Sequence, residues 1–217
     1  MLDAPSSSYI GEERGLTVHI VEDDHDLRNG LDYLLDSMGL PHRVYDSPAS
    51  FQANFSPDGG GCIVLDIRMP GLSGIDLVKW LRNEGVRLPL IMMTAHADVP
   101  VTIQAFKLGV VEFLLKPFQT EQFLAAITSA LASEQRRMAA MRESYALRER
   151  LASLSSKDWE VIDMVRRGWP NKRIAAELRI TERAVEMRRS SLLKKADVST
   201  FAALIELVTR YEWNDQP

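Results

Sequence analysis

Short apolar runs alternate with helix-spaced apolar residues along the first half of the chain. Five runs have the length and β-branched content of strands, and the segments after them repeat apolar residues every three or four positions. This alternation predicts a parallel sheet covered by helices on both faces, which is a doubly wound (βα)5 domain. The predicted strands cover 17–21, 41–45, 62–65, 88–93 and 110–115. The helices between them are predicted at 26–38, 49–55, 75–81 and 101–108.

A different pattern begins at Thr120, where no glycine or proline occurs up to Leu151. Apolar residues keep helical spacing throughout, so the stretch predicts one helix about 48 Å long. Glu134 and Arg148 occupy two turns of the apolar stripe. Two interpretations stay open: a core helix with a solvated extension, or a linker helix whose stripe pairs with a second copy of the chain. The stripe consists of Leu124, Ile127, Leu131, Met138, Met141 and Tyr145.

Residues 152–217 show helical spacing and no strand pattern. A capping box at 155–158 starts a first helix that ends at Gly168. Two short helices, 172–178 and 182–195, follow, and the three residues between them predict a helix-turn-helix. A fourth helix is expected from Phe201 to Tyr211, with Ser199 and Thr200 as candidate caps.

Composition narrows the class of protein. A chain of 217 residues is long enough for two ordinary domains or one large one, and 46% apolar and 26% charged residues are typical of a soluble globular protein. Residues 1–15 lack the features of a signal peptide and are expected to form a disordered tail. No run is long enough to cross a membrane, and the single cysteine, Cys62, fits a reducing cytoplasm. The first 118 residues carry 9 Lys and Arg against 16 Asp and Glu, whereas residues 152–217 carry 12 against 10.

The ends of the predicted strands carry the candidate chemistry. Acids follow the first strand at Glu22 and Asp23, Asp66 follows the third, Thr94 the fourth and Lys116 the fifth. In a sheet of order 2-1-3-4-5 these strand ends surround the ligand crevice. Packed carboxylates need a neutralising cation, and a small set of oxygen ligands favours Mg²⁺, or Mn²⁺ in its place. An aspartate in this position can accept a phosphoryl group as an acyl phosphate.

Each of these features alone is more often structural. An acid pair after a strand is usually a turn or a helix cap, a strand-end threonine usually only caps, and Lys-Pro is usually a turn. Their succession on strands of one predicted sheet is what indicates a site.

The same residues carry a resemblance to a known family. Residues 16–118 resemble a response-regulator receiver domain of two-component signalling, which has a flavodoxin-like fold; the matching motifs lie at 21–24, 65–71, 93–95 and 115–117, and 94–101 is similar to the FixJ branch. The resemblance implies that a sensor histidine kinase phosphorylates Asp66. It implies Mg²⁺ held by Asp23, Asp66 and the backbone carbonyl of Arg68, with Glu22 acting through water. It makes Thr94 and Phe113 the switch pair.

The last sixty residues resemble the helix-turn-helix of LuxR-type regulators, so the whole chain is similar to response regulators of the NarL/FixJ type. Ala184, Glu186 and Arg188 depart from the residues that are commonest in that family. By the resemblance, Glu186, Met187 and Ser190 face base edges, and Glu186 is suited to accept a hydrogen bond from a cytosine amino group. Phosphate contacts are expected from Lys172, Arg183, Arg188, Arg189 and Lys194.

The resulting expectation is a cytoplasmic transcription regulator with a receiver at 16–119, a helical linker continuing the fifth receiver helix at 120–151, and a DNA-binding domain at 152–217. Its expected partners are a histidine kinase, double-stranded promoter DNA, a second copy on phosphorylation, and RNA polymerase, with no membrane. One alternative is a phosphohydrolase that turns over at Asp66, although Arg68 stands where such enzymes carry a second acid. Another is a protein- or RNA-binding output, for which Glu186 is the best argument. On charge alone, the C-terminal bases can also be read as a solvated helix face.

Overall fold

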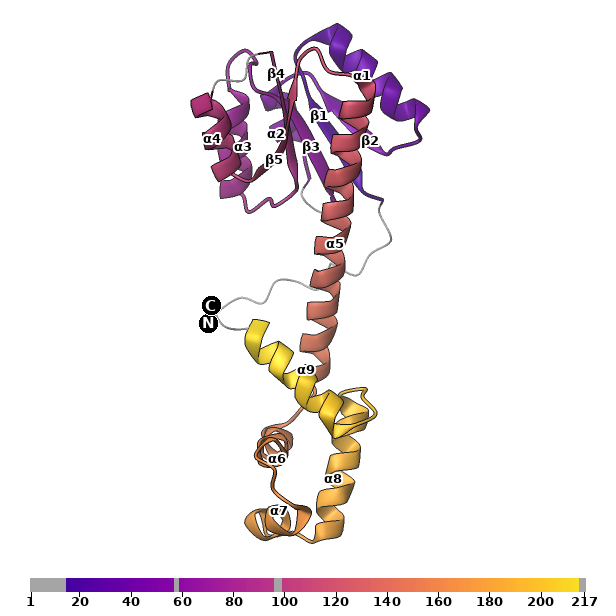
Figure 1. Ribbon diagram of the computed structural model, residues 1–217, viewed down its shortest axis with the longest axis vertical. Helices are drawn as coiled ribbons and strands as arrows, with labels where there is room; N and C mark the ends of the chain where they lie inside the picture. Colours follow the sequence, from indigo (N-terminus) through magenta and orange to yellow (C-terminus); the bar gives the residue numbers. More distant parts are fainter. Residues whose placement is uncertain (1–14, 57–58, 96–98, 215–217) are drawn as a thin grey trace. The chain divides into compact units, whose positions relative to one another are not determined.

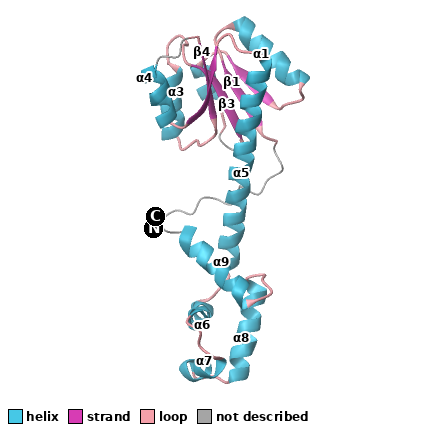
Figure 2. Cartoon of the chain, in the orientation of Figure 1, coloured by secondary structure: helices cyan, strands magenta, loops and turns pink. Residues whose placement is uncertain are grey.

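The computed structural model of the protein describes residues 15–56, 59–95 and 99–214 (Figures 1 and 2). The chain divides into two compact units, Met1–Met138 and Ala139–Pro217. The disordered tail expected at 1–15 falls outside the described part except for Gly15, so it stays a prediction. Within the described part, no helix is both long and apolar enough to cross a membrane.

The first unit is built on a five-stranded parallel sheet of order β2-β1-β3-β4-β5, which confirms the predicted fold class (Figure 2). The structure extends β3 to Asp66 and β4 to Thr94, so both of these residues end a strand instead of following one. A register shift separates Leu90 and Ile91 in the pairing of β4 with β5. The strands are β1 (Thr17–Val21), β2 (His42–Tyr45), β3 (Gly61–Asp66), β4 (Leu90–Thr94) and β5 (Val110–Leu115).

Helices cover both faces of the sheet because successive strand side chains point to opposite sides. In β3, Ile63 and Leu65 pack in one core with residues of α2, α3 and α4. Cys62 and Val64 pack in the other core, with residues of α1 and of the helix that follows β5. The first four of these helices are α1 (His25–Ser37), α2 (Pro48–Asn54), α3 (Gly74–Asn83) and α4 (Val99–Lys107).

The long helix α5 runs from Thr120 to Ala152. Its first part belongs to the sheet unit, where Phe123 and Ile127 are buried against the sheet. The side chain of Glu134 is fully buried although it is charged. Arg137 donates to both of its carboxylate oxygens, at 2.7 and 2.6 Å. The later stripe residues Met141 and Tyr145 are exposed.

The second unit contains the end of α5 and four further helices (Figure 1). Leu147 and Leu151 of α5, which lie off the predicted stripe, are buried in its main core. A smaller core joins α7 to α8 through Ile174 and Val185. The helices are α6 (Ser156–Arg166), α7 (Asn171–Leu178), α8 (Glu182–Lys195) and α9 (Phe201–Asn214).

Candidate functional site

Three carboxylates meet at the carboxyl edge of the sheet, where β1 and β3 end side by side. Glu22 and Asp23 follow β1, and Asp66 is the last residue of β3. One carboxylate oxygen from each lies within 4.8 Å of the others. Glu22 is fully buried, Asp66 is buried, and Asp23 is exposed. The structure thus brings together the acids that the sequence placed at successive strand ends.

Lys116, which directly follows β5, completes this cluster. Its ammonium group donates to Asp66 Oδ2 at 2.6 Å and to Glu22 Oε2 at 2.7 Å. Burial raises the pKa of Glu22, an effect that the bond from Lys116 only partly offsets. Burial by itself would lower the pKa of Lys116, but the two hydrogen bonds outweigh it and the pKa is raised. The lysine therefore carries its charge at neutral pH.

The donor set of the cluster suits a divalent cation. Three carboxylates face one ammonium group, so the site holds more negative than positive charge. Their oxygens are hard ligands of the kind that Mg²⁺ and Mn²⁺ bind, and the exposed Asp23 leaves one side open to water. Glu22, Asp23 and Asp66 accordingly fit the metal site expected from the sequence.

The loops after β1 and β3 fix these acids in place. Asp24 caps α1 by accepting from Asp26 N at 2.9 Å and Leu27 N at 3.0 Å. These bonds, that to Leu27 first, lower the pKa of Asp24, which is therefore engaged as a cap. After β3, Arg68 N donates to Asp66 Oδ1 at 3.1 Å. Gly74 lies so close to the carbonyl oxygen of Asp66 that a side chain there would collide with it.

Thr94 and Phe113, the predicted switch pair, occupy neighbouring strands. Thr94 ends β4 and is buried, and its carbonyl oxygen accepts from Lys116 N at 2.7 Å. This bond holds the backbone of the lysine beside the threonine. Phe113 in β5 is half-buried, and its ring centroid lies 5.1 Å from that of Phe106 in α4.

In the second unit, α7 and α8 form the predicted helix-turn-helix. Arg179 ends α7 in the left-handed region at φ 53°, and Thr181 caps α8 by accepting from Ala184 N at 3.2 Å. Val185 and Leu192 lie on the inner face of α8 and are buried in the two cores of this unit. The outer face exposes most of the predicted DNA-contacting residues, which are Arg183, Glu186, Met187, Ser190 and Lys194, and Lys172 is exposed on α7.

Two predicted phosphate contacts, Arg188 and Arg189, are only half-exposed. Arg189 donates to Asn171 Oδ1 at 2.7 Å, and its guanidinium carbon lies 4.4 Å from the centroid of the Phe201 ring. It thereby links α8 to the start of α7 and to α9. A phosphate contact from Arg189 has to compete with these two intramolecular partners.

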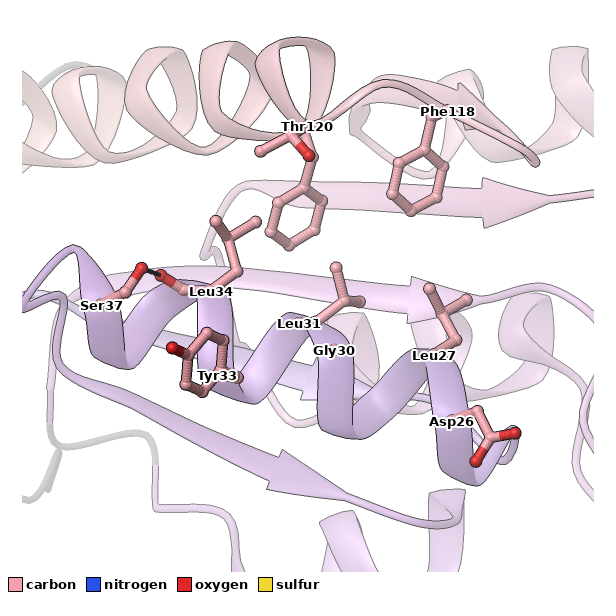
Figure 3. A pocket seen from close by; sticks show the side chains of 10 residues that line it. Asp26, Leu27, Gly30, Leu31, Tyr33, Leu34, Ser37, Phe118 and Thr120 are labelled. Carbon is pink, nitrogen blue, oxygen red and sulfur yellow. Dashed lines mark hydrogen bonds between the residues drawn. The ribbon is translucent and has the colours of Figure 1, made fainter.

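A hollow of about 420 Å³ lies elsewhere on the first unit, between α1 and the start of α5 (Figure 3). Apolar side chains such as Leu27, Leu31, Leu34 and Phe118 line most of it. Glu22, Asp23, Asp66, Thr94 and Lys116 are not among its lining residues, so this hollow is separate from the acid cluster.

Sequence reasoning missed one residue beside the acid cluster. Arg28 in α1 donates from Nη1 to the carbonyl oxygens of Glu22 and Asp23, at 2.8 and 3.1 Å. The sequence contained a hint of this contact. Side chains in a helix tilt toward its N-terminus, so a basic residue in the first turn of α1 can reach the loop before the helix. Carbonyl oxygens carry no sequence signature of their own, so the partners of Arg28 could not be read from the pattern.

Comparisons with known proteins agree with this architecture. Residues 18–128 match the response regulator receiver domain family, and residues 152–208 match the luxR family of bacterial regulatory proteins. The chain therefore belongs to the response regulators that join a receiver domain to a LuxR-type DNA-binding domain. Membership implies a histidine kinase as the partner of the receiver and DNA as the partner of the second domain.

Individual relatives are similar over nearly the whole chain. Transcriptional regulatory protein FixJ of Azorhizobium caulinodans is 37% identical over 194 residues, which cover 88% of this chain and 91% of that protein. Response regulator protein TodT of Pseudomonas putida is 35% identical over 199 residues, covering 91% and 87%. The solved structure of the response regulator StyR has a TM-score of 0.83 at 38% identity, covering 90% of this chain and 98% of that one. Like FixJ and TodT, the chain is a transcriptional response regulator.

Proposed function

We propose that Asp66 is the phosphoacceptor of this response regulator and that its phosphorylation controls DNA binding by the second unit. The observation that carries the proposal is the position of Asp66 at the end of β3, 2.6 Å from the ammonium of Lys116 and beside Glu22 and Asp23. A carboxylate oxygen of Asp66 attacks the phosphorus of a kinase phosphohistidine. The new O–P bond forms as the P–N bond breaks, and the imidazole leaves.

The surrounding groups have separate roles in this proposal. Asp23, Asp66 and the carbonyl oxygen of Arg68, with Glu22 acting through water, would hold Mg²⁺ or Mn²⁺, which would neutralise charge on the transferring phosphoryl group. Lys116 exchanges its bond to Asp66 for one to a phosphoryl oxygen. The Thr94 hydroxyl donates to another phosphoryl oxygen, and Phe113 changes its rotamer as Thr94 moves. Slow hydrolysis of the acyl phosphate by water returns the protein to its starting state.

The output is DNA binding through the outer face of α8. Glu186, Met187 and Ser190 face base edges, and Lys172, Arg183, Arg188, Arg189 and Lys194 contact phosphates. The exposure of most of these side chains supports the assignment. The domains are a receiver at 16–119, a helical linker at 120–151 that continues the fifth receiver helix and whose first part packs on the sheet, and a DNA-binding domain at 152–217. The regulator acts in the cytoplasm, dimerises on phosphorylation, and contacts RNA polymerase at the promoter.

Intact-mass spectrometry tests the phosphoacceptor directly. With a small-molecule phosphoryl donor and Mg²⁺, the full chain should gain the mass of one phosphoryl group, and Asp66→Asn should gain none. Asp46→Asn is the matched control, because Asp46 is an exposed aspartate that directly follows β2 and so lies at the same sheet edge. Phosphorylation that persists in Asp66→Asn would show that the acceptor is another residue.

A further inference from the structure

The backbone carbonyls of Glu22 and Asp23, the acid pair of the candidate site, accept hydrogen bonds from a residue outside the proposed metal-ligand set. Arg28 lies in the first turn of α1, and its Nη1 donates to the carbonyl oxygens of Glu22 and Asp23, at 2.8 and 3.1 Å. The amide of Arg28 donates to the carbonyl oxygen of Asp24 at 2.9 Å. One arginine thus contacts the backbone of three successive acidic residues.

These contacts matter because the loop leaves the sheet at this point. Glu22 N donates to Tyr45 O at 3.1 Å, the last bond described here between the loop and β2. Beyond it, the backbone directs the Glu22 side chain inward, where it is fully buried, and the Asp23 side chain outward to solvent. The bond to the Glu22 carbonyl is partly buried, and a carbonyl that loses its donor away from water costs roughly 1–3 kcal/mol, whereas the bond to the Asp23 carbonyl is exposed. The loop conformation at Glu22 therefore depends on the guanidinium.

We infer that Arg28 is a positioning residue that sets the Glu22 and Asp23 carboxylates for a divalent cation. The inference rests on the proposed metal site and deepens it. Groups that orient metal ligands from outside the ligand set typically change metal affinity by about 10- to 100-fold when they are removed. Arg28 would exert this effect through two backbone carbonyls, without touching the cation itself.

The positive charge of Arg28 and its hydrogen bonds affect Mg²⁺ binding in opposite directions. The direction in which the Kd for Mg²⁺ changes therefore tests the inference. A guanidinium near the site repels a cation, so removing the charge alone would tighten Mg²⁺ binding. Removing the two hydrogen bonds frees the loop and would weaken Mg²⁺ binding. A neutral substitution therefore distinguishes a positioning role from a purely electrostatic one.

The experiment is a calorimetric titration of the full-length chain with MgCl2. Arg28→Gln and Arg28→Met, of which the latter keeps the apolar stem, should each raise the Kd for Mg²⁺ by about 10- to 100-fold. Arg28→Lys keeps the charge and a donor, and its Kd should fall between those of the wild type and Arg28→Gln. Arg87→Gln is the control, because it removes the same charge from an exposed residue before β4. Arg87 lies at the end of the sheet where the strands begin, opposite the acid cluster. Its Kd should stay within twofold of the wild-type value.

Two results would overturn the inference. An unchanged or lower Kd in whichever of Arg28→Gln and Arg28→Met folds, with normal binding by the wild type, would contradict the positioning role and leave the metal site standing. A wild-type chain that binds no Mg²⁺ would remove the metal site and, with it, the role of Arg28. Circular dichroism before each titration establishes that the variant is folded.

Discussion

The two functional surfaces of this protein use charge in opposite ways. At the carboxyl edge of the sheet, Glu22, Asp66 and Lys116 are withdrawn from solvent and joined by hydrogen bonds of 2.6 and 2.7 Å. On α8, Arg183, Glu186 and Lys194 are exposed. A buried charge that loses its partner is costly, whereas an exposed charge is screened by water and salt. Single substitutions should therefore change folding stability at the first surface and change only binding at the second.

The largest expected effect is at Lys116. Lys116→Met leaves two buried carboxylates without their cationic partner and should lower the free energy of unfolding of the receiver by roughly 3–5 kcal/mol without Mg²⁺. Saturating Mg²⁺ should restore part of this loss, because the cation neutralises the same acids. Urea unfolding with and without Mg²⁺ measures both effects.

Lys79→Met is the matched control for Lys116→Met. Lys79 pairs with Asp76 at 2.9 Å on the surface of α3, and such pairs are worth about 1 kcal/mol or less. Equal losses in the two variants would contradict the contrast between buried and exposed charge.

The second expected effect is a loss of folding stability at acid pH that occurs in the receiver and not in the helical unit. His19 is buried in β1, and burial, the larger cause, lowers its pKa from 6.5 to about 4. The unfolded chain binds this proton first, so the receiver should lose stability as the pH falls from about 6.5 to 4. The loss should approach about 3 kcal/mol, at 1.36 kcal/mol for each pKa unit.

All four histidines lie in the first 96 residues, so this loss should be confined to the receiver. Amide hydrogen exchange followed by mass spectrometry reads the two units separately. His19→Gln should flatten the pH profile of the receiver, whereas His25→Gln, a change at an exposed histidine, should not. A receiver profile that is unchanged in His19→Gln would assign the acid sensitivity to other groups.

A smaller effect is expected at the one buried acid described in the helical unit. Asp158 completes the capping box with Ser155 and accepts from Lys195 Nζ at 2.6 Å. Burial would raise its pKa, but the bonds from Lys195 and Ser155 outweigh this and lower it. Asp158→Asn should cost roughly 1–2 kcal/mol at pH 7. Because the folded pKa is depressed, the contribution is present above about pH 4 and is lost as the pH falls through the folded value.

Urea unfolding of the wild type and Asp158→Asn at pH 7 and at pH 3 measures this contribution. The difference between the two proteins should shrink at the lower pH. Glu160→Gln, which removes an exposed acid from the same helix, should cost less than about 0.5 kcal/mol. A difference between wild type and Asp158→Asn that stays constant with pH would mean that the carboxylate charge is not what stabilises the helix start.

The smallest effect on stability, but a clear one on binding, is expected at Glu186. Glu186→Lys changes an exposed side chain and should leave the free energy of unfolding within about 0.5 kcal/mol. It should raise non-specific DNA affinity, steepen the salt dependence by about one or two counterions, and change the preferred half-site. Binding-site selection at two salt concentrations measures all three. Identical preference and slope would place Glu186 away from DNA.

The sheet and the acid cluster could be predicted because both follow from short-range patterns. A fully apolar run such as 62–65 fits only a buried strand in this context, and parallel strands bring their carboxyl ends to one edge. Strand order then places Asp66 and Lys116 on either side of the end of β4, and the long lysine side chain spans the gap between them. The helix-turn-helix was equally visible, because caps such as Thr181 mark helix starts.

The rest depends on contacts that the pattern does not specify. The stripe along α5 did not include Leu147 and Leu151, which pack in the helical unit. Met141 and Tyr145 of the stripe are exposed in the single chain, which fits both a solvated extension and a surface for a second copy. The α5 residues buried in the sheet unit, such as Phe123 and Ile127, and those buried in the helical unit, Leu147 and Leu151, do not fall on one stripe, so a single stripe cannot describe the helix. The pattern placed a charge, Glu134, in the apolar stripe but did not reveal that Arg137, one turn later, pairs with it and allows its burial.

The most direct test of the account is whether the two surfaces are coupled. The affinity of the full-length chain for a selected DNA site is measured with and without beryllofluoride, which mimics the acyl phosphate, in the presence and absence of Mg²⁺. Binding should strengthen by about 5- to 150-fold only when beryllofluoride and Mg²⁺ are both present, and Asp66→Asn should abolish the change. An affinity that is the same under all conditions would contradict control of the DNA-binding surface by the acid cluster.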